Sequence, residues 1–285
     1  TAGIGYSQEL KFDRLSVDKG LSQGNVWDIH QDSLGFIWIA TEDGLNLFDG
    51  YNFTVFINDP EDSTSISNNN VHGIAEDKNG NIWIATQDGL NLYNRDFNNF
   101  KRFVHDPNDP GSLSNSNINF LYCDSKNNIW ACTAGGGLNL YDRETQKFIH
   151  FRHSSNDPNS LADDYIRGIV EDKSKKVWVA SMGGLSMMRP DGKSFINYKH
   201  DPDNSQSISS NKVMTLFVDN DNTLWAGTFD AGLNKLNNGS FIRYAHIPNN
   251  PSSLAASYVY NINENNEGEL WIATDGGLNL MDKQN

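Results

Sequence analysis

Short hydrophobic runs separated by polar turns return along this chain at a nearly constant interval. The clearest example lies at 37–47, where an apolar stretch around a tryptophan is followed by a polar turn and a second apolar stretch that begins with Gly-Leu. The pattern recurs five more times, so that six of the seven tryptophans occupy one repeated position, at spacings of 45, 47, 48, 47 and 46 residues. These are Trp38, Trp83, Trp130, Trp178, Trp225 and Trp271. Such a period, with one tryptophan per unit, is typical of a repeat architecture in which each unit forms one supersecondary element.

The second unit shows which elements the pattern predicts. Strands are expected at 71–76 and 82–86, joined by a turn whose Asp and Gly favour a tight reversal, and a third strand is expected at 90–93. A fourth strand is marked by two aromatic residues three positions apart, here Phe100 and Phe103. Four short strands joined by tight turns predict one antiparallel sheet of the propeller-blade kind.

The spacings indicate how the units meet. From the first aromatic residue of a fourth strand to the next repeated tryptophan there are 30 residues in all five cases, whereas the distance from tryptophan to the following aromatic varies between 15 and 18. Length variation is thus confined to hairpins inside a unit, as expected if neighbouring sheets pack at one constant angle. A βαβ arrangement is excluded because no unit contains the apolar period of a helix.

The two ends of the chain predict how the ring closes. The last unit ends after 278–282 and supplies three strands, while the segment 12–17 has the apolar spacing of a fourth strand. Because natural proteins protect sheet edges, we expect 12–17 to pair with the last unit. The predicted fold is all-β, a single-domain β-propeller over residues 1–285, with six four-stranded antiparallel blades and the last blade closed by the N-terminal strand. The alternative is part of a seven-bladed propeller, which would leave two blades unable to close.

Charge and termini narrow the functional classes. The formal net charge of −14 would repel a phosphate backbone, so no nucleic-acid contact is expected. No apolar run approaches the roughly 18 residues that a membrane helix needs, so no membrane span is expected. Residues 1–9 are interpreted as the remnant of a signal peptide or as a disordered terminus, and the former interpretation predicts export.

The repeat resembles a known family, and the second unit shows the resemblance best. An Ile-Ser pair and three asparagines precede the first strand, Glu-Asp and Gly-Asn frame the turn, and the tryptophan strand is followed by Gly-Leu. These residues are Ile66, Ser67, Asn68, Asn69, Asn70, Val71, Glu76, Asp77, Gly80, Asn81, 82–86, Gly89 and Leu90. The unit is similar to the two-component regulator propeller repeat, and the resemblance covers the chain from about Leu10 to Asp282.

The resemblance implies a place in a larger sensor. Such repeats are typical of periplasmic sensor regions of Bacteroidetes hybrid two-component systems, where paired propellers precede a small β domain, a membrane helix, a histidine kinase and a DNA-binding regulator. Many of these sensors respond to oligosaccharides. This chain has six units and no second propeller, kinase or regulator, so it looks like the first propeller of such a sensor, or an excised or standalone relative. Any kinase activity would reside outside this chain.

Residues that occur in every unit are interpreted as structural, because a group repeated around a ring packs sheets or closes turns. Four histidines share one position in the loops between units and are expected to pin those loops: His105, His153, His200 and His246. Variable positions near the start of each first strand are better candidates for binding. They combine flat apolar rings with hydrogen-bonding groups, as sugar recognition requires. The predicted ligand-binding residues are Trp27, His72, Asn119, Arg167, Tyr165, Tyr258, Tyr260 and Glu42, and the loop residues Gln87, Phe229 and Asp275 could join them.

Catalytic and metal-binding motifs are not found. The chain contains no Gly-x-Ser-x-Gly elbow and no His-Glu-x-x-His sequence. The segment 219–223 lacks the Gly and Glu of a calcium loop and is interpreted as a turn. No catalytic residue, metal or cofactor is therefore predicted. The two cysteines, Cys123 and Cys132, flank one predicted turn and are candidates for a disulfide only if they face each other.

Three functions remain open. The first is a non-catalytic sensor that binds an oligosaccharide or other small ligand, or docks a second propeller or β domain of the same sensor; a homodimer is compatible with it. The second is a propeller enzyme, such as a polysaccharide or cyclic-ester lyase using His72, Arg167 and Tyr260. The third is a purely structural dimerisation module.

Overall fold

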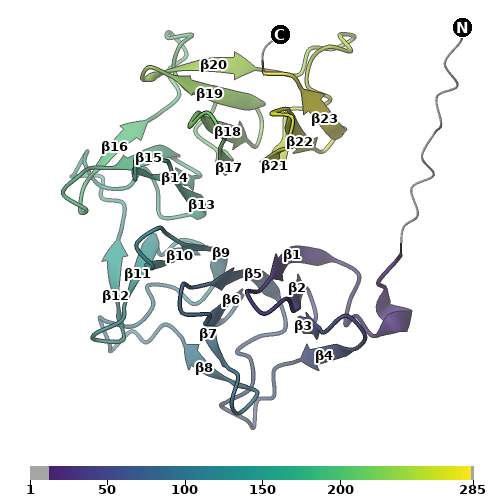
Figure 1. Ribbon diagram of the computed structural model, residues 1–285. Helices are drawn as coiled ribbons and strands as arrows, with labels where there is room; N and C mark the ends of the chain where they lie inside the picture. The colour runs from purple at the N-terminus through teal and green to yellow at the C-terminus, as the bar shows by residue number, and fades with distance from the viewer. Residues whose placement is uncertain (1–12, 284–285) are drawn as a thin grey trace, which may run out of the picture.

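The computed structural model describes residues 13–283, which form 23 strands in six antiparallel sheets (Figure 1). We call these sheets blades 1 to 6 in chain order. Blade 1 contains β1 (Val26–Gln31), β2 (Ile37–Thr41), β3 (Gly44–Phe48) and β4 (Phe53–Phe56), and blade 2 contains β5 (Val71–Glu76), β6 (Ile82–Thr86), β7 (Gly89–Asn94) and β8 (Asn99–Phe103). Blade 3 contains β9 (Ile118–Cys123), β10 (Ile129–Thr133), β11 (Leu138–Asp142) and β12 (Lys147–Phe151), and blade 4 contains β13 (Ile166–Glu171), β14 (Val177–Ser181), β15 (Gly184–Met188) and β16 (Phe195–Tyr198). Blade 5 contains β17 (Val213–Val218), β18 (Leu224–Thr228), β19 (Leu233–Asn237) and β20 (Ser240–Tyr244), and blade 6 contains β21 (Val259–Glu264), β22 (Leu270–Thr274) and β23 (Gly277–Met281).

The blades are arranged radially, with their first strands innermost (Figure 1). The first strands contact one another in chain order, β1 on β5, then β9, β13, β17 and β21. The prediction of an all-β propeller with six blades is confirmed. Within blades 1 to 5 the strand order is the sequence order, which short hairpins impose.

The core consists of the interfaces between neighbouring blades. Each blade has a front face, which carries the repeated tryptophan, and a back face; the front faces of blades 1 to 5 pack on the back faces of blades 2 to 6. Between blades 1 and 2, for example, Trp38 and Leu45 of the front face meet Val71, Ile74 and other residues of the back face. Four further apolar clusters of the same kind join blades 2 to 6. Burial of both sheet faces explains why the strands 82–86 and 129–133 are apolar without alternation.

The repeated polar residues have structural partners. In blade 2, the Thr86 hydroxyl donates to the carbonyl oxygen of Gly89 at 3.0 Å and lies 2.8 Å from the Ser67 hydroxyl. Gly89 adopts a φ of 134°, and a Cβ there would lie 2.7 Å from the carbonyl oxygen of Phe103, so the turn requires glycine. These contacts confirm the structural interpretation of the repeated residues.

The four loop histidines also behave as expected. The ring nitrogen Nδ1 of each lies 2.6–2.9 Å from the carbonyl oxygen eight residues further on, in the apolar-Ser or apolar-Ala pair that opens the next unit. These pairs are His105–Leu113, His153–Leu161, His200–Ile208 and His246–Leu254. Because a carbonyl oxygen can only accept, Nδ1 carries the proton.

In blades 1 to 5, the turn between the first and second strands contains an aspartate that accepts a hydrogen bond from the repeated tryptophan of its own blade. In blades 1, 2 and 5 this aspartate also pairs with a basic residue of the next blade. The Asp77 carboxylate accepts a hydrogen bond from the Trp83 indole at 3.2 Å and pairs with Arg143 of blade 3 at 2.9 Å. Asp32 pairs with Arg95 of blade 2 at 2.8 Å in the same way. Asp219 of blade 5 pairs with Lys283 of blade 6 at 3.2 Å. In each pair the carboxylate is buried, and the pair crosses a blade boundary.

The predicted closure of the last blade is wrong. Phe12 lies outside the described residues, residues 13–16 are not in a strand, and Val17–Lys19 form a short 3-10 helix, η1. Blade 6 has three strands, β21, β22 and β23, in the described chain. A hollow of about 750 Å³ runs along β23, lined among others by Leu278, Leu280 and Met281. The predicted signal remnant or disordered terminus at 1–9 also lies outside the described residues.

The cysteines do not face each other. Cys132 pairs in register with Phe120 and Cys123 with Ile129 across the β9–β10 ladder, and both are free thiols. Burial raises the pKa of Cys132 far above its usual range. The disulfide considered from the sequence is therefore not formed.

Candidate functional site

The variable positions near the starts of the first strands share a backbone irregularity. In every blade the residue after the leading Val or Ile has no partner across the first-to-second-strand ladder, because the register shifts there by one residue. These residues are Trp27, His72, Asn119, Arg167, Met214 and Tyr260. A β-bulge re-aims a side chain and frees it from the in-out alternation of the strand. The six positions can therefore differ in residue type without changing the pairing of the first and second strands.

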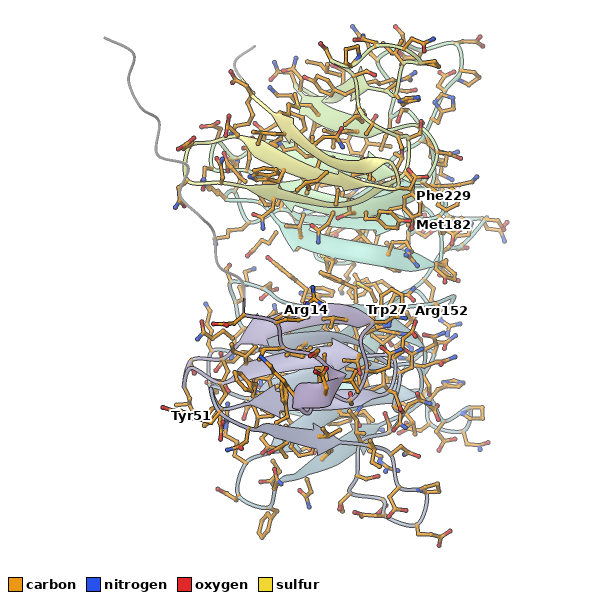
Figure 2. The ribbon with its side chains drawn as sticks, turned by 90° about the vertical axis from the view of Figure 1, so that its right-hand side faces the viewer. Arg14, Trp27, Tyr51, Arg152, Met182 and Phe229 are labelled. Carbon is orange, nitrogen blue, oxygen red and sulfur yellow. The ribbon has the colours of Figure 1, made fainter. Side chains whose placement is uncertain are left out.

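Trp27 and His72 lie together on blades 1 and 2. Their ring centroids are 6.4 Å apart in an edge-to-face arrangement, and Trp27 is exposed. The nearby Glu42 carboxylate accepts a hydrogen bond from the Asn25 amide at 2.9 Å. Figure 2 shows Trp27 on the same face of the molecule as Met182 and Phe229, and Tyr51 on the opposite side. We call the face with Trp27, Met182 and Phe229 the mouth face.

Two of the predicted residues connect neighbouring blades. The Nδ1 atom of His72 lies 2.7 Å from the carbonyl oxygen of Ile118 in blade 3, so Nδ1–H donates and Nε2 is the ring nitrogen left for another partner. The Asn119 amide donates to the carbonyl oxygen of Ile166 in blade 4 at 2.8 Å. Asn119 therefore has a structural role that the sequence did not indicate, and His72 has only one ring nitrogen left for a ligand.

Blades 5 and 6 carry an aromatic group. The rings of Tyr258 and Tyr260 are 4.1 Å apart at an interplanar angle of 30°, and the Phe229 ring lies 4.8 Å from Tyr258. The Lys212 ammonium lies 5.4 Å from the centre of the Phe229 ring and 2.8 Å from the Asp230 carboxylate. Tyr260 and Phe229 are exposed, so their ring faces can meet a ligand.

Blade 4 supplies a cationic group. The Arg167 guanidinium lies 5.9 Å from the centre of the Tyr165 ring. Its Nε is buried and has no hydrogen-bond partner among the residues that the structure describes. Burial raises the pKa of Tyr258, and the positive charge of Arg167 acts in the opposite direction. Arg167 is thus electrostatically coupled to the aromatic group of blade 6.

The structure therefore brings the predicted residues together in three groups, Trp27 with His72, Tyr165 with Arg167, and Tyr258 with Tyr260. Lys212 occupies the same position before its strand as Tyr165 and Tyr258, but it was not among the eight predicted ligand-binding residues. Phe229 was predicted only as a loop residue that could join them.

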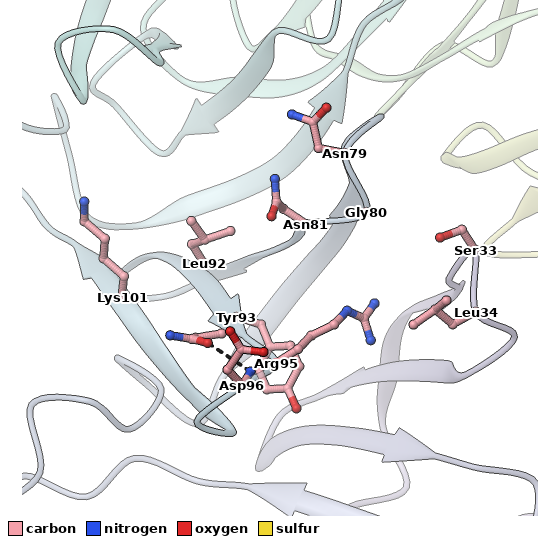
Figure 3. Close-up of a pocket in the computed structure, with 11 residues that line it drawn as sticks. Ser33, Leu34, Asn79, Gly80, Asn81, Leu92, Tyr93, Arg95, Asp96 and Lys101 are labelled. Carbon is pink, nitrogen blue, oxygen red and sulfur yellow. Dashed lines mark hydrogen bonds between the residues drawn. The ribbon is translucent and has the colours of Figure 1, made fainter.

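A hollow of about 610 Å³ lies at the boundary of blades 1 and 2, beside the first-to-second-strand turns. Leu34, Asn81, Tyr93 and Arg95 are among its lining residues (Figure 3). Arg95 is already paired with the buried Asp32 carboxylate. Among the described residues, no group of three or more His, Cys, Asp or Glu side chains is placed to hold a metal ion.

Comparisons with known proteins agree with the repeat. Residues 20–43, 65–88, 112–135 and 207–230 match the family described as two component regulator propeller. A 48-residue stretch is 60% identical to Histidine kinase P4 of Formosa agariphila, a match that covers 17% of this chain and 4% of that protein.

Solved structures share the fold. The extracellular domain assigned to a hybrid two component system of B. thetaiotaomicron aligns over 95% of this chain and 41% of that chain, with 26% identity and a TM-score of 0.55. A catalytically inactive virginiamycin B lyase from Staphylococcus aureus aligns over 90% of this chain and 80% of that chain, with 14% identity and a TM-score of 0.61. This second likeness concerns the fold alone.

The chain thus spans less than half the length of the kinase and of the extracellular domain that it resembles. Over residues 13–283, none of the helices has the length and apolar character needed to cross a bilayer.

Proposed function

Since the chain belongs to the two component regulator propeller family, we propose that it is a non-catalytic, ligand-binding sensor domain of a hybrid two-component system. It acts in the periplasm as part of a membrane-anchored sensor, and its ligand is an oligosaccharide or a similar small polyhydroxylated molecule. Support for export comes from its likeness to an extracellular sensor domain.

One observation carries the binding proposal. The six bulge positions lie at the same place in every blade, among buried residues that repeat, but the residue type at the bulge differs from blade to blade. Exposed rings from them, Trp27 and Tyr260, accompany Phe229 and the cations Lys212 and Arg167. Flat rings stack on the apolar faces of sugars, and the polar groups fix orientation through hydrogen bonds.

Signalling requires that the ligand bind two arrangements of the sensor with different affinity. A second propeller or β domain of the same sensor would supply the second contact surface. Binding at the mouth face would then shift how the propeller docks on that partner.

Calorimetric titration of the full chain with a panel of neutral, acidic and sulfated oligosaccharides tests the proposal. For a saccharide that binds, Trp27→Ala and Tyr260→Ala should each weaken the affinity at least about tenfold, equivalent to ~1.4 kcal/mol, because each ring supplies a stacking surface. Tyr51→Ala is the matched control, since Tyr51 is 91% exposed and lies on the opposite side; it should leave the affinity unchanged.

Product analysis of the same mixtures separates the other functions. Cleaved or eliminated products would assign the chain to the propeller enzymes and contradict the sensor proposal. No heat with any saccharide would contradict ligand binding and favour a docking module. Unchanged affinity in both Trp27→Ala and Tyr260→Ala would remove the mouth face from the proposal.

A further inference from the structure

Among the arginines of blades 2 to 6, only Arg167 has no hydrogen-bond or ion-pair partner in the part of the chain that the structure describes. Its Nε atom is buried without a partner, and its terminal nitrogens make no hydrogen bond or ion pair with residues 13–283. Each of the other arginines pairs with a buried aspartate or donates to a backbone carbonyl oxygen. These are Arg95, Arg143, Arg102, Arg152, Arg189 and Arg243. A charged donor without an acceptor is rare in folded proteins and calls for an explanation.

The lack of a counter-charge at Arg167 is unusual because the chain is acidic, with a net charge of −14. Lys212, the other cation described on the mouth face, lies 2.8 Å from the Asp230 carboxylate and is neutralised by it. The Asp275 carboxylate acts on the same Tyr258 phenol as Arg167, but the two charges form no ion pair with each other. Arg167 therefore keeps its positive charge available for a ligand.

Arg167 occupies the bulge position of β13, which is equivalent to that of Trp27 in β1. It therefore lies at the end of the innermost strand that reaches the mouth face (Figures 1 and 2). Its guanidinium lies 5.9 Å from the centre of the Tyr165 ring, which is 38% exposed. Its charge also acts on Tyr258, which stacks with the exposed Tyr260. One cation thus stands among ring faces that a sugar can contact.

The chemistry of the guanidinium indicates which group it would bind. A guanidinium stays charged at any physiological pH, and its donors form a planar fork that matches the oxygens of a carboxylate or of a tetrahedral oxyanion. A sugar hydroxyl accepts a weaker hydrogen bond than such an anion does. We propose that Arg167 determines the specificity of the mouth face and selects a saccharide that carries a carboxylate or a sulfate group. This assignment rests on the proposed function, since it names the class of ligand for the same face.

Calorimetric titration of the full chain with matched pairs of oligosaccharides tests the proposal. Each uronic-acid oligosaccharide is paired with its carboxyl-reduced neutral form, and each sulfated oligosaccharide with its desulfated form. Within at least one pair, the anionic member should bind at least about tenfold more tightly, because only it supplies a charged acceptor. The pair that shows the preference identifies the group as a carboxylate or a sulfate.

Arg167→Gln removes the charge but keeps a polar side chain. It should weaken binding of the anionic member about tenfold and change binding of the neutral member less than about twofold, so that the preference disappears. A merely structural role of Arg167 would weaken both members alike. Arg152→Gln is the matched control, because it removes the same charge from the same side of the molecule (Figure 2). It should leave the preference unchanged, since the Arg152 guanidinium already donates to the carbonyl oxygen of Ser114 at 3.1 Å.

Equal affinity for the two members of every pair that binds would overturn the assignment of Arg167 and leave the proposed function intact. This comparison uses the wild-type chain and does not depend on how any variant folds. A preference that persists in Arg167→Gln, or that Arg152→Gln abolishes as completely, would also overturn the assignment. If neither member of any pair binds, the proposed function fails and the assignment fails with it.

Discussion

Trp83→Ala is expected to lower the free energy of unfolding by about 3–5 kcal/mol, the range for removing a large buried aromatic side chain. Trp83 is 1% exposed in the interface between blades 2 and 3. Its ring lies 4.9 Å from that of Tyr141 and 5.9 Å from that of Phe103. The substitution would leave a cavity between two sheets and remove a hydrogen bond to Asp77.

Trp271→Ala is the matched control at the equivalent position. Because Trp271 is 39% exposed and has no ring partner among the described residues, we expect a loss of at most about 1 kcal/mol. Urea denaturation monitored by circular dichroism gives both free energies of unfolding. The slope of the free energy against urea concentration should be the same for both variants and the wild-type chain. Equal losses for the two variants would show that the front face of blade 6 is covered in solution.

Asp77→Asn is expected to destabilise the chain by about 2 kcal/mol, because it leaves the Arg143 guanidinium without its buried counter-charge. The turn itself should persist, since Asn265 in blade 6 accepts the same backbone hydrogen bonds through its side-chain oxygen. Asp172→Asn is the control. Asp172 also accepts from its tryptophan, at 3.1 Å, but no base pairs with it in the described part of the chain. It should cost about 1 kcal/mol or less.

The Asp77 effect should depend on pH. Burial by itself would raise the pKa of Asp77, but hydrogen bonds from the Asn81 amide, the Trp83 indole and the turn backbone outweigh burial and lower it. A lowered pKa means that the carboxylate stabilises the fold above about pH 4, and that this stabilisation is lost as the pH falls through the folded-state pKa. The difference between the wild-type chain and Asp77→Asn should therefore shrink in acid. A difference that stays constant down to pH values well below 4 would contradict the lowered pKa of Asp77.

Most of the fold could be predicted because short-range sequence patterns specify each blade and recur in every unit. Each unit contains its own turn signals, its own tryptophan strand and its own fourth-strand aromatics, so an error in one unit is corrected by the other five. The constant number of residues between a fourth strand and the next repeated tryptophan predicted that neighbouring blades pack in one geometry. All five interfaces between blades have the same arrangement of apolar residues.

The N-terminal strand was mispredicted because its assignment depended on a single local pattern. That pattern was the three-residue spacing of Phe12 and Leu15; Phe12 lies outside the described residues, and Leu15 and Val17 are exposed. Ser16 and Gly20 favour a turn instead, since Gly20 adopts a φ of 108° and its N–H donates to the carbonyl oxygen of Val17 at 3.0 Å. Ring closure depends on contacts between distant segments, which no local pattern specifies.

The candidate site was only partly predictable for a different reason. Variation among units identified the bulge positions, but the sequence does not show which side chains are used within the frame. Asn119 and His72 bond to the next blade, whereas Tyr258 and Tyr260 stack on each other. The direction of a side chain at a bulge depends on its neighbours in the adjacent blade.

The central claim is that the ligand binds at the mouth face. Hydroxyl-radical footprinting with mass spectrometry, which reports side-chain exposure, tests it most directly when the full chain is labelled with and without a saturating oligosaccharide. The binding proposal predicts reduced labelling of Trp27, Tyr258 and Tyr260, with Tyr51 labelled as before. Protection confined to the side that carries Tyr51, or none at Trp27 and Tyr260 while the saccharide is bound, would contradict it.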